Sequence, residues 1–223
     1  IESEGAVSIE NSTIADGDGS GVVARRGGGT IRNSRITGQT KLGLDAQAPS
    51  GVGLSNMTLD GVTFEGNQGA AVQGGAAMQW TLVNNAATGN DVNGIVVPGG
   101  SVDRPMILRG GDLPYVFTGS VVHSKDLTIE PNTILKFSSP TANLRVRGTA
   151  RLVAEGSEAQ PIIATTDADD SACLFAGDPT PRISCDTDND AKEPRPGAWQ
   201  RIEVEDTGGA ASIKHVTLRY GSS

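Results

Sequence analysis

The chain has 223 residues and a formal net charge of −8, from 26 acidic and 18 basic residues. This acidic balance argues against nucleic acid and an anionic membrane surface as partners, and no apolar run is long enough for membrane insertion. Aromatic residues make up only 4% of the chain, and there are 30 glycines. Small and β-branched side chains must therefore fill the core, which favours narrow stacked coils over a wide globular interior.

Four short stretches in the first half of the chain repeat one pattern. Each has an apolar residue, a spacer, Asn or Gly, a small or β-branched residue, a second spacer and a second apolar residue. The stretches are Ile9–Ile14, Ile31–Ile36, Leu59–Phe64 and Leu82–Ala87. Their starts lie about 22 to 28 residues apart, a period typical of solenoid proteins. Each repeat is then one coil that can bury its apolar face only against its neighbours.

The third position of this repeat predicts how each coil turns. It is occupied by Asn11, Asn33, Gly61 and Asn84. Asn and Gly tolerate the left-handed backbone region that other residues avoid. One such residue between two short strands bends the chain sharply, as the corner of a parallel β-helix requires. A further copy starting at Ile213 has His215 in this position, where we expect a corner residue rather than a general base.

The second half of the chain has a different spacing of strand-like segments. Residues 127–137 and 144–154 each contain two alternating segments about a turn. A Pro-Ile-Ile segment at 161–163, a long polar insertion and a Pro-Gly-Ala-Trp segment that opens 196–204 follow. Period-two alternation is typical of strands with one buried face.

This order of segments resembles bacterial extracellular proteins with right-handed parallel β-helix repeats, the pectate-lyase-like superfold. The resemblance covers residues 6–98 and 120–221, and it departs from the family pattern at Asn132 and at Gln200-Arg201, where glycine is common. Asn132 still permits a left-handed corner. It implies an all-β chain, a right-handed parallel β-helix of roughly nine coils with one long inserted loop. It implies much less about activity, because this fold hosts lyases, hydrolases, phage tailspikes, adhesins and spacers.

We predict a single β-helix domain over residues 1–223. Residues 1–99 carry the Asn/Gly corners, and residues 100–223 carry the second repeat type with an inserted loop at 165–196. The repeat resumes near the end of the sequence and neither end shows a polar cap, so we expect a piece of a longer array. Its partners would include neighbouring β-helix repeats of the parent chain, and its location would be secreted or at the cell surface.

The inserted loop contains the two cysteines of the chain, Cys173 and Cys185. A disulfide between them would close a short loop and stabilise the fold by about 3 kcal/mol on the chain-entropy model. Such a bridge fits an oxidising compartment, and the alternative is a pair of unpaired thiols. Two cysteines without a nearby histidine do not complete a zinc site.

The inserted loop also has carboxylates at alternate positions, Asp186, Asp188 and Asp190. This spacing lets a curling loop direct three oxygens at one hard cation, so calcium is the candidate cofactor. The stretch fails as an EF-hand, because Ala191 stands where the glycine belongs. A looser site could be completed by backbone carbonyls or by Asp167 and Asp169, and the alternative is a solvated acidic loop.

Basic and aromatic residues supply the candidates for polysaccharide binding. The basic candidates are Lys136, Arg145, Arg147 and Arg151. Alternation places them outward, where they could face an anionic glycan, and it places Leu135, Leu144, Val146 and Leu152 on the opposite, buried side. Outward charges are also the usual way to keep strands solvated and unaggregated. Trp80 and Trp199 are large enough to stack on sugar rings, although Trp199 is better placed as a packed plug at the end of the inserted loop.

The sequence supplies no convincing catalytic residues. No Ser-His-Asp set, Cys-His pair or phosphate-binding glycine loop has the required context. The richest carboxylate pair, Asp16 and Asp18, lies in what reads as an ordinary connection between coils. We therefore expect a structural or adhesive β-helix segment that binds carbohydrate, a cell-surface receptor or calcium. The alternatives are a carbohydrate-active enzyme (polysaccharide lyase or glycoside hydrolase) and a phage tailspike segment.

Overall fold

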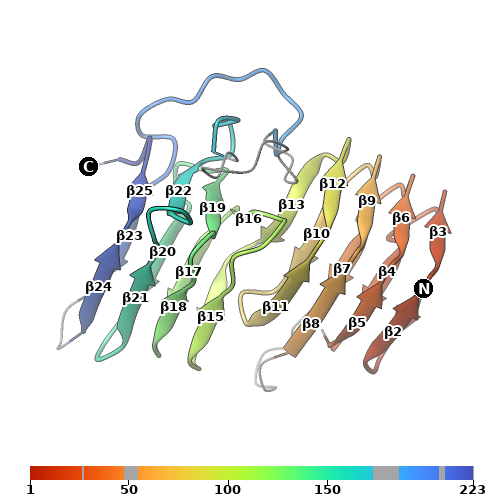
Figure 1. The fold of residues 1–223 in the computed structure, drawn as a ribbon, viewed down its shortest axis with the longest axis horizontal. Helices are drawn as coiled ribbons and strands as arrows, with labels where there is room; N and C mark the ends of the chain where they lie inside the picture. The colour runs from red at the N-terminus through yellow and green to blue at the C-terminus, as the bar shows by residue number, and fades with distance from the viewer. Residues whose placement is uncertain (27, 48–54, 173–185, 206–208, 223) are drawn as a thin grey trace.

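A computed structural model describes residues 1–26, 28–47, 55–172, 186–205 and 209–222. Within these residues the chain forms twenty-five strands and no helix. The strands stack into an elongated solenoid with the two chain ends at opposite ends of the molecule (Figure 1). None of the described segments is a helix long and apolar enough to span a membrane.

One sheet, which we call sheet A, runs the whole length of the solenoid. It has nine parallel strands, one from each successive coil, which confirms the expected all-β parallel β-helix of roughly nine coils. In spatial order the strands of sheet A are β1 (Glu2–Ser3), β4 (Val22–Ala24), β7 (Leu44–Ala46), β10 (Ala70–Gly74), β13 (Val92–Val97), β16 (Tyr115–Phe117), β19 (Ile134–Phe137), β22 (Ile162–Thr166) and β25 (Val216–Leu218).

Two further sheets complete the first four coils. Sheet B consists of β2 (Val7–Glu10), β5 (Gly29–Arg32), β8 (Ser55–Asp60) and β11 (Met78–Val83). Sheet C consists of β3 (Thr13–Ala15), β6 (Arg35–Thr37), β9 (Thr63–Glu65) and β12 (Ala86–Thr88). Each strand of sheet B is followed by the corner residue, by one further residue and then by a strand of sheet C, as the repeat predicts.

Two different sheets complete the later coils. Sheet D consists of β14 (Gly100–Val102), β17 (Ser120–His123), β20 (Asn143–Val146) and β23 (Arg201–Val204). Sheet E consists of β15 (Met106–Leu108), β18 (Leu127–Ile129), β21 (Arg151–Glu155) and β24 (Ala210–Lys214). Sheet A continues across this change of architecture, although the pairing of β10 with β13 shifts register between Ala70 and Val72.

The corner residues adopt the backbone conformation that the repeat predicts. The six positions have left-handed φ angles between 44° and 67°. They are Asn11, Asn33, Gly61, Asn84, Asn132 and His215. His215 therefore turns the chain between β24 and β25. Histidine is one of the residue types enriched in the left-handed region, which accounts for its occurrence at this position of the repeat.

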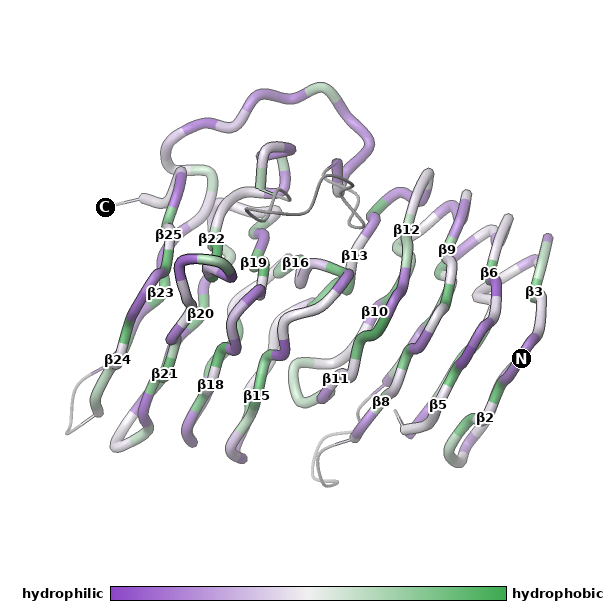
Figure 2. Tube along the Cα trace, viewed as in Figure 1, coloured by the Kyte–Doolittle hydropathy of each residue, from purple (hydrophilic) through white to green (hydrophobic). Residues whose placement is uncertain are grey.

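The core is one continuous apolar column along the solenoid. Inward side chains of adjacent sheet A strands stack in register, as in the row Val72, Ile95, Tyr115 and Leu135. Green and purple segments alternate along many strands in Figure 2, which reflects the burial of alternate residues. This regular column leaves the inserted loop as the largest departure from the repeat.

Candidate functional site

The inserted segment after β22 folds back over the outer face of sheet A. Its described parts are residues 167–172 and 186–200. The backbone N–H of Asn93, on β13, donates a hydrogen bond of 2.8 Å to the carbonyl oxygen of Thr187. Strands β16 and β19 lie between β13 and β22 in sheet A, so the segment reaches back across two strands (Figure 1).

A ladder of buried amide side chains ends on the inserted segment. The Oδ1 atom of Asn90 accepts from the backbone N–H of Asn67 at 3.1 Å, and the Oδ1 atom of Asn93 accepts from that of Asn90 at 3.0 Å. The Nδ2 atom of Asn93 then donates to the carbonyl oxygen of Asp186 at 3.0 Å and to Oδ1 of Asn189 at 3.1 Å. The inserted segment thus accepts hydrogen bonds from the Nδ2 and backbone N–H groups of Asn93. These bonds fix the position of the inserted segment on the solenoid.

Lys136 lies beneath the inserted segment. It alternates with the core residues Leu135 and Phe137, so it points to the outer face as predicted, yet it is only 1% exposed. Its Nζ atom donates to Oγ1 of Thr187 at 3.0 Å and to the carbonyl oxygen of Asp167 at 3.4 Å. Burial lowers the pKa of Lys136, and nearby carboxylates oppose that shift. Lys136 is therefore a buried anchor for the inserted segment and does not face solvent.

Three carboxylates meet beside this lysine. Oxygens of Asp170, Asp186 and Asp188 all lie within 4.8 Å of one another. Burial, followed by repulsion from neighbouring carboxylates, raises the pKa of both Asp170 and Asp188. The Oδ1 atom of Asp188 is buried with no hydrogen-bond partner among the described residues. We call these three residues the acidic cluster.

The acidic cluster contains two of the three residues that the sequence suggested for calcium. The third, Asp190, instead forms an ion pair with Lys192, and this contact lowers its pKa. Its place in the cluster is taken by Asp170, from the opposite side of the insertion. Alternate spacing along one segment could not identify Asp170, because its contact with the others is made only when the two ends of the insertion meet.

Asp169 joins the inserted segment to the last strand. This carboxylate is 2% exposed, and it accepts hydrogen bonds from Oγ1 of Thr165 at 2.7 Å and Oγ of Ser171 at 2.6 Å. The guanidinium of Arg219 lies 3.2 Å from its Oδ2 atom. Burial opposes ionisation of Asp169, but these donors outweigh it and lower its pKa. Asp169 is a satisfied structural carboxylate.

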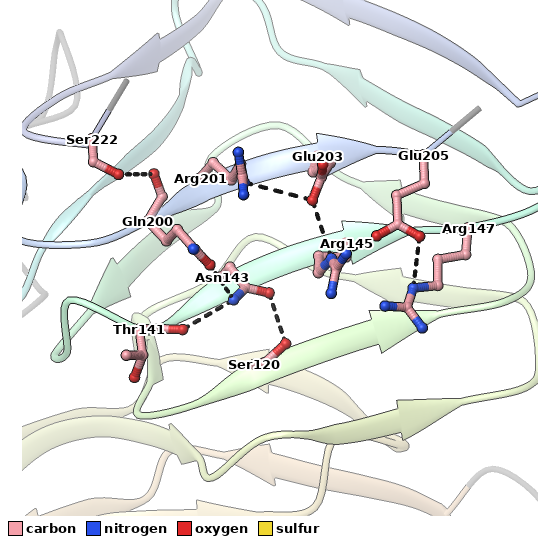
Figure 3. A network of polar contacts seen from close by, with 10 residues as sticks. All are labelled: Ser120, Thr141, Asn143, Arg145, Arg147, Gln200, Arg201, Glu203, Glu205 and Ser222. Carbon is pink, nitrogen blue, oxygen red and sulfur yellow. Dashed lines mark hydrogen bonds and ion pairs between the residues drawn. The ribbon is translucent and has the colours of Figure 1, made fainter.

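The four basic residues suggested for glycan binding do not form one stripe. Arg145 and Arg147 lie on and just after β20 of sheet D, where Glu203 and Glu205 pair with their guanidinium groups (Figure 3). Arg151 starts β21 of sheet E and is exposed. The fourth, Lys136, is buried on sheet A. The structure therefore places these residues on three different sheets.

Neither tryptophan is available to a sugar. Trp80 is 1% exposed and Trp199 is 2% exposed. The ring of Trp199 stacks on Phe137 with the ring centroids 4.3 Å apart. Sugar stacking is therefore wrong as an interpretation of both tryptophans. The prediction that Trp199 is a packed plug is confirmed. Cys173 and Cys185 lie outside the described residues, so their predicted disulfide stays a prediction.

The comparisons with known proteins concern the fold. A family model described as the right-handed β-helix region matches residues 1–138. No curated protein matches the chain, and no solved structure matches it.

Proposed function

The chain belongs to the right-handed β-helix family, and from this premise we propose that it is a non-catalytic structural module, a rigid solenoid that presents its inserted segment. We place it in a secreted or cell-surface bacterial protein. The inserted segment is the part of the described chain that departs from the repeat and adds a surface of its own. A scaffold that holds such a segment in place fits a spacer or an adhesive stalk.

The observation that carries this proposal is the pairing of outward charges. Basic side chains on the outer faces meet acidic side chains of the neighbouring coil. These pairs are Arg25–Glu2, Arg32–Asp60, Arg35–Glu65, Arg109–Glu130, Arg145–Glu203 and Lys214–Glu155. Each exposed pair contributes only about 0–1 kcal/mol. Their distribution over several faces is what a solvated rod requires. The titratable groups that do gather in one place, Lys136 and the acidic cluster, lie at the inserted segment, where the lysine donates to Thr187 and to the carbonyl oxygen of Asp167 and so holds the segment on sheet A.

Neighbouring β-helix coils are the partners that we propose for one end of the rod. Ile213 and Leu218 are 57% and 58% exposed, and they line an apolar cavity of about 140 Å³ together with Ile202 and Val204. The apolar side chains of this last coil lie in the same column as the core. A further coil would cover them in the way that each coil covers the one before it.

An assay for polysaccharide breakdown tests the non-catalytic role. We expect no release of unsaturated or reducing ends when the protein is incubated with polygalacturonate, alginate or neutral glucans, because the ion pairs between its coils are spread over several faces. A polysaccharide lyase acting on the same substrates serves as the positive control. Turnover that disappears when a carboxylate of the acidic cluster is replaced would establish the enzyme instead. A trimer that survives dilution would favour the phage tailspike segment.

Calcium binding is a second candidate function, and the buried, unpartnered Oδ1 atom of Asp188 is the observation that favours it. Carboxylate oxygens of this kind are ordinary calcium ligands, and extracellular modules bind calcium at about 10⁻⁴–10⁻³ M. The ammonium group of Lys136 already supplies positive charge to the acidic cluster. We therefore propose a weak site in which the ion competes with this lysine.

A calcium titration after chelation tests this second candidate. We expect calcium to raise the melting temperature, and Lys136→Met to tighten binding because the competing charge is gone. Asp188→Asn should abolish the response, while Asp103→Asn, on an 84% exposed side chain between β14 and β15, should leave it unchanged. An unchanged melting temperature at millimolar calcium in both the native protein and Lys136→Met would refute the site.

A further inference from the structure

Asn93 is followed directly by Gly94, and this is the only Asn-Gly pair in the sequence. In such a pair the backbone nitrogen of the glycine can attack the side-chain amide of the asparagine, because no Cβ atom hinders the approach. Asparagine is a thermolabile residue type, and this pair is its most labile occurrence in the chain. Deamidation turns the amide into a carboxylate, so it changes both hydrogen bonding and charge at one position.

The fold requires both members of this pair. The side chain and the backbone N–H of Asn93 hold the inserted segment on sheet A. A Cβ atom at Gly94 would lie 2.9 Å from the carbonyl oxygen of Pro114, in the next coil. Any larger residue would have to displace that backbone, so only glycine fits the stacking of these two coils. The labile pair is therefore built into the fold.

The pair lies at a β-bulge in sheet A. Between the paired positions Val92 and Ile95, β13 has two residues where β10 has one. A bulge leaves an extra residue outside the regular ladder and redirects its side chain. Here the bulge directs Asn93 toward the inserted segment, where its N–H donates to the carbonyl oxygen of Thr187 at 2.8 Å. Rare local opening, rather than unfolding of the whole rod, is enough to free the pair for reaction.

The two ends of the Asn93 amide have opposite hydrogen-bonding roles. Its Oδ1 atom accepts from the backbone N–H of Asn90 at 3.0 Å and from the Nδ2 atom of Asn90 at 2.9 Å, and a carboxylate oxygen accepts equally well. Its Nδ2 atom donates to the carbonyl oxygen of Asp186 and to Oδ1 of Asn189, and a carboxylate has no proton to donate. Turning over the amide of Asn189 would supply a donor but would break its bond to the carbonyl oxygen of Asn90. Deamidation thus keeps the bonds to the coil and removes those to the inserted segment.

The new charge would also stand beside the acidic cluster. Asp186 and Asp188, which flank the contact point Thr187, already bring their carboxylate oxygens within 4.8 Å of each other and of Asp170. A further negative charge next to them raises the repulsion across the docked surface. A buried carboxylate without a donor also costs more than a neutral group in the same place. Charge and hydrogen bonding therefore both act to separate the inserted segment from β13.

We propose that Asn93 is a deamidation site and that its conversion to aspartate or isoaspartate releases the inserted segment from sheet A. When β13 opens locally, the backbone nitrogen of Gly94 bonds to Cγ of Asn93, and its proton leaves with the amide nitrogen as ammonia. Water then opens the resulting succinimide ring at either carbonyl group, so the net change is the gain of water and the loss of ammonia. Opening at one carbonyl gives aspartate. Opening at the other gives isoaspartate, which carries Cβ into the main chain and displaces the N–H that Thr187 accepts.

This modification goes beyond the scaffold role and does not depend on it, because the inserted segment docks on Asn93 in the same way on a rod and on an enzyme. The assay for polysaccharide breakdown reads the scaffold role separately. No amide re-forms after hydrolysis, so the release runs in one direction.

Ageing of the native protein at mildly alkaline pH tests the chemical step. We expect peptide mapping by mass spectrometry to show conversion at Asn93 before Asn11 and Asn33, which are exposed but are followed by serine. Asn189→Gly removes the side-chain contacts with Asn90 and Asn93, and glycine accepts the φ of 52° at that position. This variant should speed the conversion of Asn93 several-fold, because the inserted segment then protects the pair less.

Hydrogen exchange of Asn93→Asp tests the release. The backbone N–H at position 93 is the donor to Thr187, so its exchange rate reports whether the inserted segment is docked. We expect this rate to rise roughly tenfold or more over that of the native protein. The matched control is Asn85→Asp, at a side chain that is 2% exposed and donates to the carbonyl oxygen of Leu59 at 3.0 Å. It makes the same chemical change away from the inserted segment and should leave exchange at Asn93 at the native rate.

Two results would overturn the proposal. In the first, Asn11 and Asn33 lose their amides during ageing while Asn93 keeps its own. In the second, Asn93→Asp and the aged, deamidated protein both exchange at position 93 at the native rate, which would show that the inserted segment stays docked on a carboxylate.

Discussion

Replacing Trp199 with alanine is expected to lower the free energy of unfolding by about 3–5 kcal/mol. The indole is 2% exposed, and it extends the aromatic stack of Phe117 and Phe137 within the core. Its Nε1 atom also donates to the carbonyl oxygen of Arg219 at 2.7 Å. The substitution therefore leaves a cavity and an unsatisfied carbonyl group at the point where the inserted segment rejoins the solenoid.

Urea denaturation of three variants measures this effect. Trp199→Phe keeps an aromatic ring on Phe137 but loses the Nε1 hydrogen bond, so it should cost about 1 kcal/mol from that bond alone. Val83→Ala, at a side chain that is 42% exposed, should change stability by less than either. A Trp199→Ala midpoint indistinguishable from that of Val83→Ala would show that the indole is not a structural plug.

The second large effect is a loss of stability on acidification that depends on His123. This residue ends β17 with its side chain in the core, 1% exposed, and its Nδ1 atom has no hydrogen-bond partner among the described residues. Burial lowers the pKa of His123 to about 4. The unfolded chain takes up this proton near pH 6.5 and the folded chain does not. The stabilisation is therefore complete above about pH 6.5 and is lost as the pH falls toward 4, by about 3 kcal/mol in total.

The pH dependence of unfolding should separate His123 from the other titrating groups. His123→Leu removes the buried imidazole at similar volume, so its stability should fall less than that of the native protein between pH 6.5 and 4. Asp170 and Asp188 titrate in both proteins and cancel in the comparison. His215→Asn, at an exposed corner, is the matched control and should behave like the native protein. Parallel curves for His123→Leu and the native protein would contradict the assignment.

The corners could be predicted from the sequence because their requirement is local. A left-handed backbone must be met by the residue itself, and Asn or Gly meets it at each repeat. The same reasoning extended to His215 and Asn132, both of which have left-handed φ angles. Alternation likewise identified Leu135 and Leu144 as core residues, because burial along a strand has a fixed period of two.

The inserted segment could not be placed in the same way. Asn93 and Asn189 lie 96 residues apart in sequence, and nothing in either stretch indicates that they meet. Alternation correctly directed Lys136 outward, but it carries no information on what covers an outer face. The same limit applies to Arg145, because its pairing with Glu203 depends on how β20 and β23 align in sheet D. Contacts between coils separated by an insertion are set by register and docking, which no local pattern encodes.

Hydrogen exchange along sheet A tests the central claim, that the chain is one rigid rod supporting its inserted segment. In sheet A the strands from β4 to β22 form a single hydrogen-bonded ladder. This ladder begins in the coils that contain sheets B and C and continues into the coils that contain sheets D and E. We predict that their backbone amides exchange with similarly high protection, including those of β13 and β16 at the change of architecture. Low protection confined to β13 and β16, with strong protection on either side, would show two halves that flex about a hinge and would contradict the rod.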